Sequence, residues 1–235
     1  MPRPLAARWH AHELSELRAG ARSTARLTVE NTGETPWRGD RFTVSYHWLD
    51  ELGNAIVWDG LRTGIRTEPG ETAAVDVAVR APMPPGRYRL AFDLVDESRF
   101  WFGEVGNPTL DFHVDVRPRI DGPDDAEAHL GDAVAADGWS ELVYAAHREG
   151  YAVVGGSVEA PRRLGRRRPA ELGPYTPPGR VPSFAHPLVC ASVVKGVDVE
   201  WTTVAGLPAV VPPADEPYLY DGRIRVRLPS GRRRG

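Results

Sequence analysis

Two pairs of aromatic and acidic residues in the first half of the chain have the chemistry of a sugar-binding site. Trp58 is followed directly by Asp59, and Trp101 is followed three positions later by Glu104. Indole faces stack on the flat C–H faces of sugar rings, and carboxylates accept hydrogen bonds from sugar hydroxyls. We therefore interpret Trp58, Asp59, Trp101 and Glu104 as candidate glycan-binding residues. The alternative is that both tryptophans pack in a core or at its edge.

The second half of the chain contains the residue types that an enzyme would use. In this hypothesis the active site lies within residues 119–235, and its pocket is formed by His147, Glu159, Tyr175, Arg180 and His186. Asp137 and Glu141 are further titratable candidates. Because these residues do not form a recognised catalytic motif, we favour a non-catalytic function.

Metal and phosphate chemistry have weaker support in the sequence. His10 and His12 have a spacing at which two imidazoles can bind a metal ion, but no third ligand is apparent, so we predict neither a metal site nor a cofactor. Arginines are concentrated at residues 162–168 and 232–234. Aromatic residues are not interleaved with them as in single-strand binders, and the formal net charge is −3. We read both segments as solvated and expect no nucleic-acid partner.

Strands with one apolar face are expected to position the residues of the first half. Apolar side chains alternate with other residues over 42–49, so that Phe42, Val44, Tyr46 and Trp48 share a face. The alternation recurs in four further runs, at 27–29, 74–79, 88–94 and 110–117. Turn-forming Asn, Gly and Pro residues separate the runs. This pattern predicts an antiparallel β-sandwich.

The chain is predicted to be mainly β, with an N-terminal extension at residues 1–19, the sandwich at 20–118 and a small irregular α+β domain at 119–235. The boundary follows from proline, glycine and aspartate at 117–125, where the alternation stops. Residues 137–150 have helical spacing, and we expect Asp137 to cap this helix and Gly150 to end it.

The rest of the second domain is expected to contain short strands. Residues 151–154 predict a buried strand, which Gly155 and Gly156 would end as a turn. Residues 187–194 fit either a strand or a short helix, because periodicity does not distinguish the two over so short a run. Isoleucine, valine and leucine alternate with arginine at 223–228, which predicts a last strand.

The first half also resembles a known type of domain. The resemblance rests on an Asn-Thr-Gly turn before a tryptophan, a Pro-Gly turn, an Ala-Pro-x-x-Pro-Gly-x-Tyr phrase and a closing Trp-Phe-Gly, that is, on Asn31, Gly33, Trp37, Pro69, Gly70, Ala81, Pro82, Pro85, Gly86, Tyr88, Trp101, Phe102 and Gly103. These residues are similar to those of immunoglobulin-like sandwiches of the four-tryptophan type. They also resemble accessory sandwiches attached to bacterial glycosyltransferases, methyltransferases and polysaccharide exporters.

A second, shorter resemblance concerns the enzyme hypothesis. The segment Gly150-Tyr151-Ala152-Val153-Val154-Gly155-Gly156 resembles strands of nucleotide-sugar glycosyltransferases. The Asp-x-Asp pair of the metal-dependent members has only a loose counterpart here, Asp198-Val199-Glu200.

Composition places the chain among ordinary globular proteins. It has 235 residues, of which 41% are hydrophobic and 26% charged, and its single cysteine, Cys190, excludes an internal disulfide. The apolar neighbours of Cys190 predict a buried, inert thiol. We see neither an apolar leader at the N-terminus nor an apolar run of about 20 residues, so we expect a cytoplasmic protein without a membrane span. Arginine largely replaces lysine, which suggests a GC-rich bacterial genome.

Three hypotheses follow. The first is a non-catalytic accessory protein of bacterial cell-envelope polysaccharide assembly that recognises a glycan or docks a glycosyltransferase or methyltransferase, as the resemblance implies. The second is a glycosyltransferase-related enzyme with its active site in residues 119–235. The third is a structural module that forms homodimers through a sheet edge.

Overall fold

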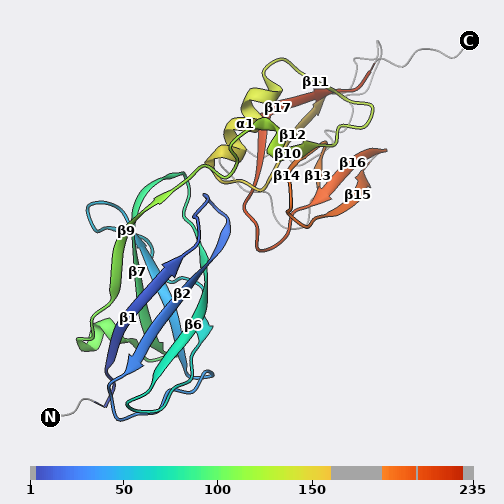
Figure 1. Cartoon of the computed structure of the whole chain (residues 1–235). Coiled ribbons are helices and arrows are strands. Elements are labelled where there is room, and N and C mark those ends of the chain that lie inside the picture. Colours follow the sequence, from blue (N-terminus) through green and yellow to red (C-terminus); the bar gives the residue numbers. More distant parts are fainter. Residues whose placement is uncertain (1–3, 160–186, 205, 230–235) are drawn as a thin grey trace, which may run out of the picture. The chain divides into compact units, whose positions relative to one another are not determined.

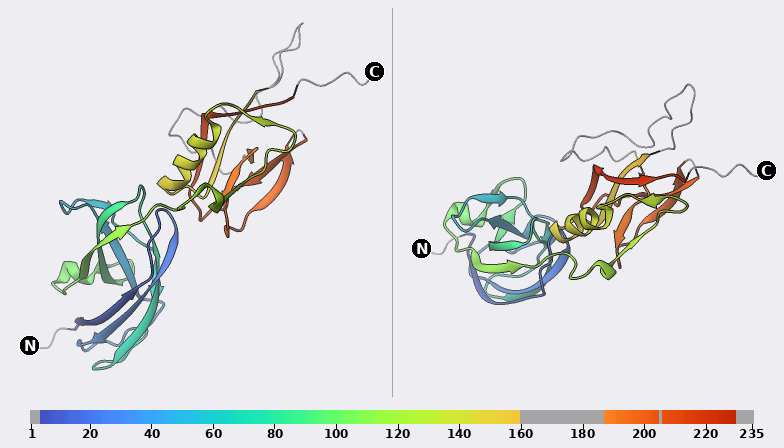
Figure 2. Two further views of the ribbon diagram at one scale, coloured as in Figure 1. Left: turned by 45° about the horizontal axis from the view of Figure 1, so that its top comes forward. Right: turned by 90° about the horizontal axis from the view of Figure 1, so that it is seen from above.

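The computed structural model describes residues 4–159, 187–204 and 206–229, and within it the chain divides into two compact units, 1–117 and 118–235. The first unit is an antiparallel β-sandwich (Figures 1 and 2). One sheet has the order β1-β2-β6, formed by Ala7–Leu14, Arg22–Asn31 and Thr72–Arg80. The other has the order β4-β3-β7-β8, formed by Ala55–Val57, Phe42–Leu49, Gly86–Asp96 and Phe100–Trp101. Two further strands extend it, since β5 (Thr63–Gly64) pairs with β3 and β9 (Leu110–Val116) pairs with β7.

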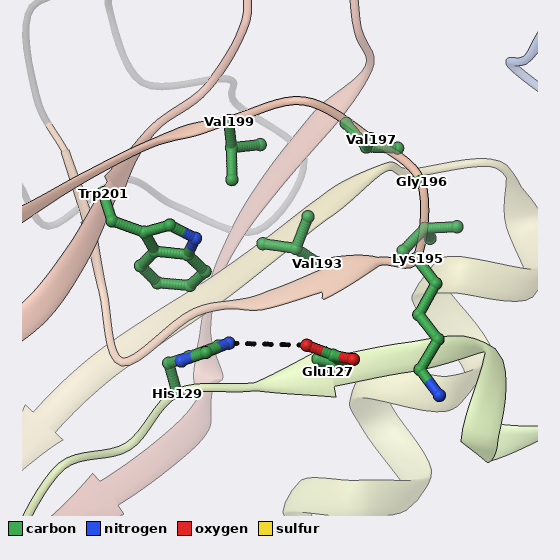
Figure 3. Close-up of a pocket in the computed structure, with 9 residues that line it drawn as sticks. Glu127, His129, Val193, Lys195, Gly196, Val197, Val199 and Trp201 are labelled. Atoms are coloured by element: carbon green, nitrogen blue, oxygen red, sulfur yellow. Dashed lines mark ion pairs between the residues drawn. The ribbon is translucent and has the colours of Figure 1, made fainter.

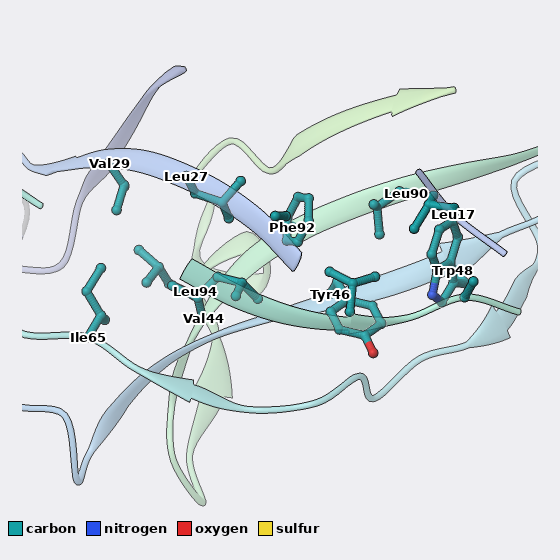
Figure 4. Close-up of a cluster of buried hydrophobic side chains, with 14 of the residues drawn as sticks. Leu17, Leu27, Val29, Val44, Tyr46, Trp48, Ile65, Leu90, Phe92 and Leu94 are labelled. Carbon is teal, nitrogen blue, oxygen red and sulfur yellow. The ribbon is translucent and has the colours of Figure 1, made fainter. Parts of the chain in front are cut away.

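The core lies between the two sheets and contains the side chains that the alternation assigned to the inner faces (Figure 4). Phe42, Val44, Tyr46 and Trp48 of β3 are all buried, and Leu90, Phe92 and Leu94 of β7 pack beside them. Two hydrogen bonds join the sheets through Arg80 of β6. The Trp48 indole N–H donates to the Arg80 carbonyl oxygen at 2.8 Å, and the Arg80 backbone N–H donates to the Tyr46 hydroxyl at 2.8 Å. The predicted sandwich is therefore confirmed.

One expectation about the first unit is wrong, because part of the presumed N-terminal extension is a strand of the sandwich. Ala7–Leu14 forms β1, which pairs antiparallel with β2, with an irregularity at His10. This strand carries little apolar alternation because most of its side chains are exposed. The strand is held by backbone hydrogen bonds. Because every residue except proline has the same backbone donor and acceptor, these bonds do not require a particular sequence pattern.

The second unit is also mainly β. Its five-stranded sheet has the order β10-β14-β12-β17-β11, formed by Ala126–Ala128, Ser192–Val194, Val153–Glu159, Tyr218–Arg227 and Val134–Ala135. Three further strands form a separate sheet of order β13-β16-β15, with bounds Leu188–Val189, Leu207–Val211 and Glu200–Val204. The predicted last strand, up to Arg227, forms the end of β17, where Ile224 and Val226 are buried and the intervening arginines are exposed. The ambiguous run at 187–194 forms β13 and β14.

The helix α1 (Trp139–Glu149) packs on the five-stranded sheet through Val143 and Ala146, which contact Val154 and Ile224. Gly150 ends it as predicted, and its N–H donates to the carbonyl oxygens of Ala146 and His147. The N-cap is Gly138, with a φ of 77° and no side-chain cap, so the expectation that Asp137 caps the helix is wrong. The described part of the chain contains no helix with the length and apolarity of a membrane span.

The glycine pair Gly155-Gly156 is not a turn, because β12 continues through it to Glu159 and pairs in parallel with β17. A Cβ atom on Gly156 would lie 1.8 Å from the carbonyl oxygen of Ile224, so only glycine lets the two backbones approach this closely. The strand register shifts directly after this residue. Gly156 thus permits the close backbone contact at an irregularity inside the sheet, and the pair does not end the strand.

Candidate functional site

The outer face of the β3–β7 pair is the most unusual surface of the sandwich. The alternation directs Ser45, His47 and Asp93 away from the core, where solvent is expected, yet all three are buried. The loop after β4 and the short strand β8 bring Trp58 and Trp101, respectively, next to this face. Buried polar side chains are costly without partners, so their arrangement here is informative.

His47 lies at the centre of this arrangement and is 4% exposed. Its ring stacks on Trp58, with the ring centroids 4.0 Å apart and the planes 24° apart, and lies 4.2 Å from the Trp101 ring. Burial lowers the pKa of His47, so the ring is neutral at pH 7. Nδ1 contacts the Trp58 carbonyl oxygen, which can only accept, so this assigns the proton to Nδ1 and leaves Nε2 as an acceptor.

Asp93 is the second buried group and is 2% exposed. One carboxylate oxygen accepts the Leu94 N–H at 2.7 Å and the other accepts the Gly103 N–H at 3.0 Å. Burial raises the pKa of Asp93 to about 6, the two N–H groups oppose this shift, and the charge of Glu104 adds to it. A Cβ atom on Gly103 would lie 2.9 Å from the carboxylate, so glycine allows this close backbone contact.

These groups line a cavity of about 440 Å³ on the outer face of the sheet. Its wall includes His47, Trp58, Asp93, Trp101, Glu104 and Asp111. The volume lies within the usual range for small-molecule sites, which are mostly apolar with a few placed polar groups. Trp58 is 53% exposed, which leaves much of its ring open to a ligand.

Three of the four residues predicted for a glycan site line this one cavity. The ring centroids of Trp58 and Trp101 are 6.3 Å apart, and a carboxylate oxygen of Glu104 accepts the backbone N–H of Trp101 at 3.0 Å. Asp59 is not on the wall and forms an ion pair with Arg62. Arg62 in turn lies over the Trp101 ring, 4.6 Å from its centroid.

Sequence reasoning missed His47 and Asp93, which are the two most deeply buried polar residues of the site. They lie on β3 and β7, respectively, at positions where outward-facing residues are usually solvated. The available signal was that these outward positions include several uncharged or apolar residues, such as Ala91 and Val95. A strand with two apolar faces predicts that both are covered.

The residues predicted for an enzyme pocket are not brought together by the described part of the second unit. His147 is buried in the core, where Nδ1 lies 2.8 Å from the Tyr151 carbonyl oxygen and Nε2 lies 2.9 Å from the Ser192 hydroxyl. Glu159 instead pairs with Arg225 and Arg227 of β17. Tyr175, Arg180 and His186, together with the arginines at 162–168 and 232–234, lie outside the described residues.

The second unit has a cavity of its own, of about 340 Å³, which none of the predicted residues lines (Figure 3). Its lining includes Val193 and Val199, which lie on opposite sides of it, and Trp201 lies at one end. The His129 ring is 4.2 Å from the Trp201 ring, and its Nε2 is 3.8 Å from a Glu127 oxygen. All its polar side chains are exposed, in contrast to the buried His47 and Asp93 of the sandwich cavity.

The histidine pair near the N-terminus has separate contacts. His10 Nε2 lies 2.8 Å from a Glu30 oxygen, and the His12 ring stacks on Phe112 at 4.1 Å. Among residues 4–159, 187–204 and 206–229, no group of three or more His, Cys, Asp or Glu side chains is placed to hold a metal ion.

No protein-family model matches the chain, and no curated protein matches it either. The solved structures that resemble part of it include the C-terminal domain of wzt, with 11% identity over 50% of this chain and 77% of that domain, at a TM-score of 0.36. A β-glucosidase from Listeria innocua in complex with gluconolactone has 14% identity over 47% of this chain and 16% of the enzyme, at a TM-score of 0.31. A family 123 glycoside hydrolase from Clostridium perfringens has 13% identity over 51% of this chain and 28% of the enzyme, at a TM-score of 0.31. The chain therefore spans most of the wzt domain but less than a third of either hydrolase.

Proposed function

We propose that the first unit is a carbohydrate-recognition module and that its site is the cavity between Trp58, Trp101 and the outer face of β3 and β7. The observation that carries this proposal is the combination of an exposed indole ring, Trp58, and a partly buried one, Trp101, with buried polar groups around one cavity. Aromatic rings supply the stacking surface for a sugar, and the polar groups select among its hydroxyls. The site is built on paired strands, which hold its base in place.

The proposal is for binding without catalysis. Asp93 accepts two backbone N–H groups, and one nitrogen of His47 is bound to the Trp58 carbonyl oxygen. Both side chains are thus held in fixed orientations at the base of the site. A fixed acceptor suits the recognition of a hydroxyl or an amine, so we assign these groups to ligand selection.

We further propose that the sandwich is of the immunoglobulin-like type and that the protein serves bacterial cell-envelope polysaccharide assembly. The strand order supports the first part, since β1-β2-β6 and β3-β7-β9 correspond to the A-B-E and C-F-G neighbours of that fold. In this role the module would bring a polysaccharide to a glycosyltransferase, a methyltransferase or an exporter.

A glycan array, followed by calorimetry on the polysaccharide class that binds, tests the proposed site. We expect Trp58→Ala and Trp101→Ala each to weaken binding at least about tenfold, because each removes a stacking surface. Trp201→Ala is the matched control, since it makes the same change at the cavity of the second unit. Circular dichroism shows whether each variant remains folded.

Three results are informative. Binding that is lost in the two sandwich variants and kept in Trp201→Ala supports the proposal. Binding that is lost only in Trp201→Ala moves the site to the second unit. A folded protein that binds no glycan at high concentration refutes carbohydrate recognition.

A further inference from the structure

The hydrogen-bonding groups at the base of the sandwich cavity are acceptors. His47 is more than nine-tenths buried and lines the cavity, its Nε2 is an acceptor, and this atom has no hydrogen-bond partner among the described residues. Asp93 and Glu104 add carboxylate oxygens to the same wall. A ligand that fills this space must therefore bring donors to it.

The charged groups on the wall point to the same conclusion. The cavity is lined by the carboxyl groups of Asp93, Glu104 and Asp111 and by one guanidinium group, that of Arg89. Arg89 forms an ion pair with Asp111. This pairing leaves Asp93 and Glu104 as carboxyl groups without a cationic partner on the wall.

The other donors near the cavity are neutral or engaged. The Asn107 amide donates to the carbonyl oxygens of Leu5 and Phe102, and its oxygen accepts the Ala7 N–H. The indole N–H groups of Trp58 and Trp101 and the Thr109 hydroxyl can donate hydrogen bonds to neutral oxygen atoms of a ligand. An anionic sugar would thus meet unpaired carboxyl groups, whereas an ammonium group supplies three donors and a positive charge.

We propose that the ligand of this cavity is a carbohydrate with a free amino group, such as a hexosamine unit, and that acidic sugars are excluded. This inference rests on the proposed function and adds the substrate class. The ring of the sugar stacks on the exposed Trp58 ring, because the His47 ring already lies against both indoles. The ammonium group of the sugar faces His47 Nε2 and the carboxyl groups of Asp93 and Glu104. The Trp58 ring adds a cation–π attraction for the same charge, whereas the Trp101 ring already has the Arg62 guanidinium 4.6 Å from its centroid.

Calorimetry on the full chain with three oligosaccharides of equal length tests the proposal. The probes are a chitosan oligomer with free amines, its N-acetylated counterpart and an oligogalacturonate. The pH is about 6, where most chitosan amines are protonated although the neighbouring oxygens lower their pKa below that of an alkyl amine. We expect the chitosan oligomer to bind at least about tenfold more tightly than the acetylated oligomer, and the oligogalacturonate not to bind. An aliphatic diamine is included because it carries ammonium groups without a sugar ring.

A charge-neutralising substitution identifies the residue responsible. Glu104→Gln keeps an oxygen to accept the backbone N–H of Trp101, and it is expected to weaken binding of the chitosan oligomer roughly fivefold. Its effect on the acetylated oligomer is expected to be small. Glu13→Gln is the matched control, because Glu13 is an exposed residue on β1 of the other sheet.

The outcomes separate this inference from the proposed function. If the acetylated or acidic oligomer binds best and needs Trp58, the carbohydrate site stands and the preference for an amine is refuted. The preference is also refuted if Glu104→Gln and Glu13→Gln have the same effect. If the diamine competes as well as the chitosan oligomer, the cavity recognises ammonium alone and carbohydrate recognition itself fails.

Discussion

Replacing Asp93 by asparagine should make the stability of the sandwich depend less on pH. The carboxyl group has a pKa of about 6 in the folded protein, against 3.8 in the unfolded chain. Each pKa unit corresponds to about 1.4 kcal/mol, so ionised Asp93 costs the folded state up to about 3 kcal/mol. This cost is absent below about pH 4, grows as the pH rises to about 6, and is constant above that value. An asparagine side chain at this position does not ionise and carries no such cost at any pH.

The substitution also has a cost that does not depend on pH. Asp93 accepts one N–H with each carboxylate oxygen, and asparagine keeps only one of these oxygens. The lost bond is worth about 1 kcal/mol or somewhat more. We therefore expect Asp93→Asn to destabilise the first unit at pH 4 and to approach or exceed the wild-type stability at pH 8.

Urea unfolding of the two proteins between pH 4 and pH 8 measures this difference. Tryptophan fluorescence reports mainly on the first unit, which contains Trp9, Trp37, Trp48, Trp58 and Trp101. His47 also titrates, with a lowered pKa, but it is present in both proteins, so the comparison isolates Asp93. A stability difference that stays constant from pH 4 to pH 8 would refute the reasoning, because it would mean that Asp93 does not change its protonation in this range.

Three further predictions concern the second unit. Gly156→Ala should destabilise it by more than about 2 kcal/mol because its Cβ would collide with the Ile224 carbonyl oxygen, whereas Gly222→Ala, with open space around it, should be nearly neutral in a thermal melt. Burial lowers the pKa of His147, so the folded state binds fewer protons than the unfolded chain, and stability should fall as the pH drops below about 6.5; His147→Gln should flatten this dependence in urea unfolding. Burial raises the pKa of the Cys190 thiol to about 11, so a thiol reagent should label it only when the unit unfolds; fast labelling of the native protein would contradict its burial.

The inner half of the sandwich could be predicted from the sequence, and its outer half could not. Alternation over residues 42–49 identifies which side chains point inward, because the pleat fixes their direction. It does not show whether a loop covers the opposite side. His47 resembles a solvated residue in the sequence, and only the folded positions of Trp58 and Trp101 bury it.

Only the residue types of the candidate site could be predicted from the sequence, because the sequence does not show which loops cover the sheet. The chemistry of Trp58, Trp101 and Glu104 is evident from residue type, and the fold places all three on one cavity. The role of Gly156 was missed because a glycine that permits close backbone approach and a glycine that makes a turn look alike in a sequence. The β1 strand was missed because an exposed edge strand needs no apolar pattern.

The parallel pairing of β12 with β17 has a consequence for the order in which the chain folds. β17 lies between β12 and β11 and spans residues 218–227, so the second unit cannot complete its larger sheet until these late residues have been synthesised. The sandwich closes with β9 at residue 116, about a hundred residues earlier. Domains generally fold as units, the N-terminal one first, and non-local strand pairing is slow. During synthesis the sandwich, with its candidate site, is therefore expected to fold before the residues of β17 in the second unit have been synthesised.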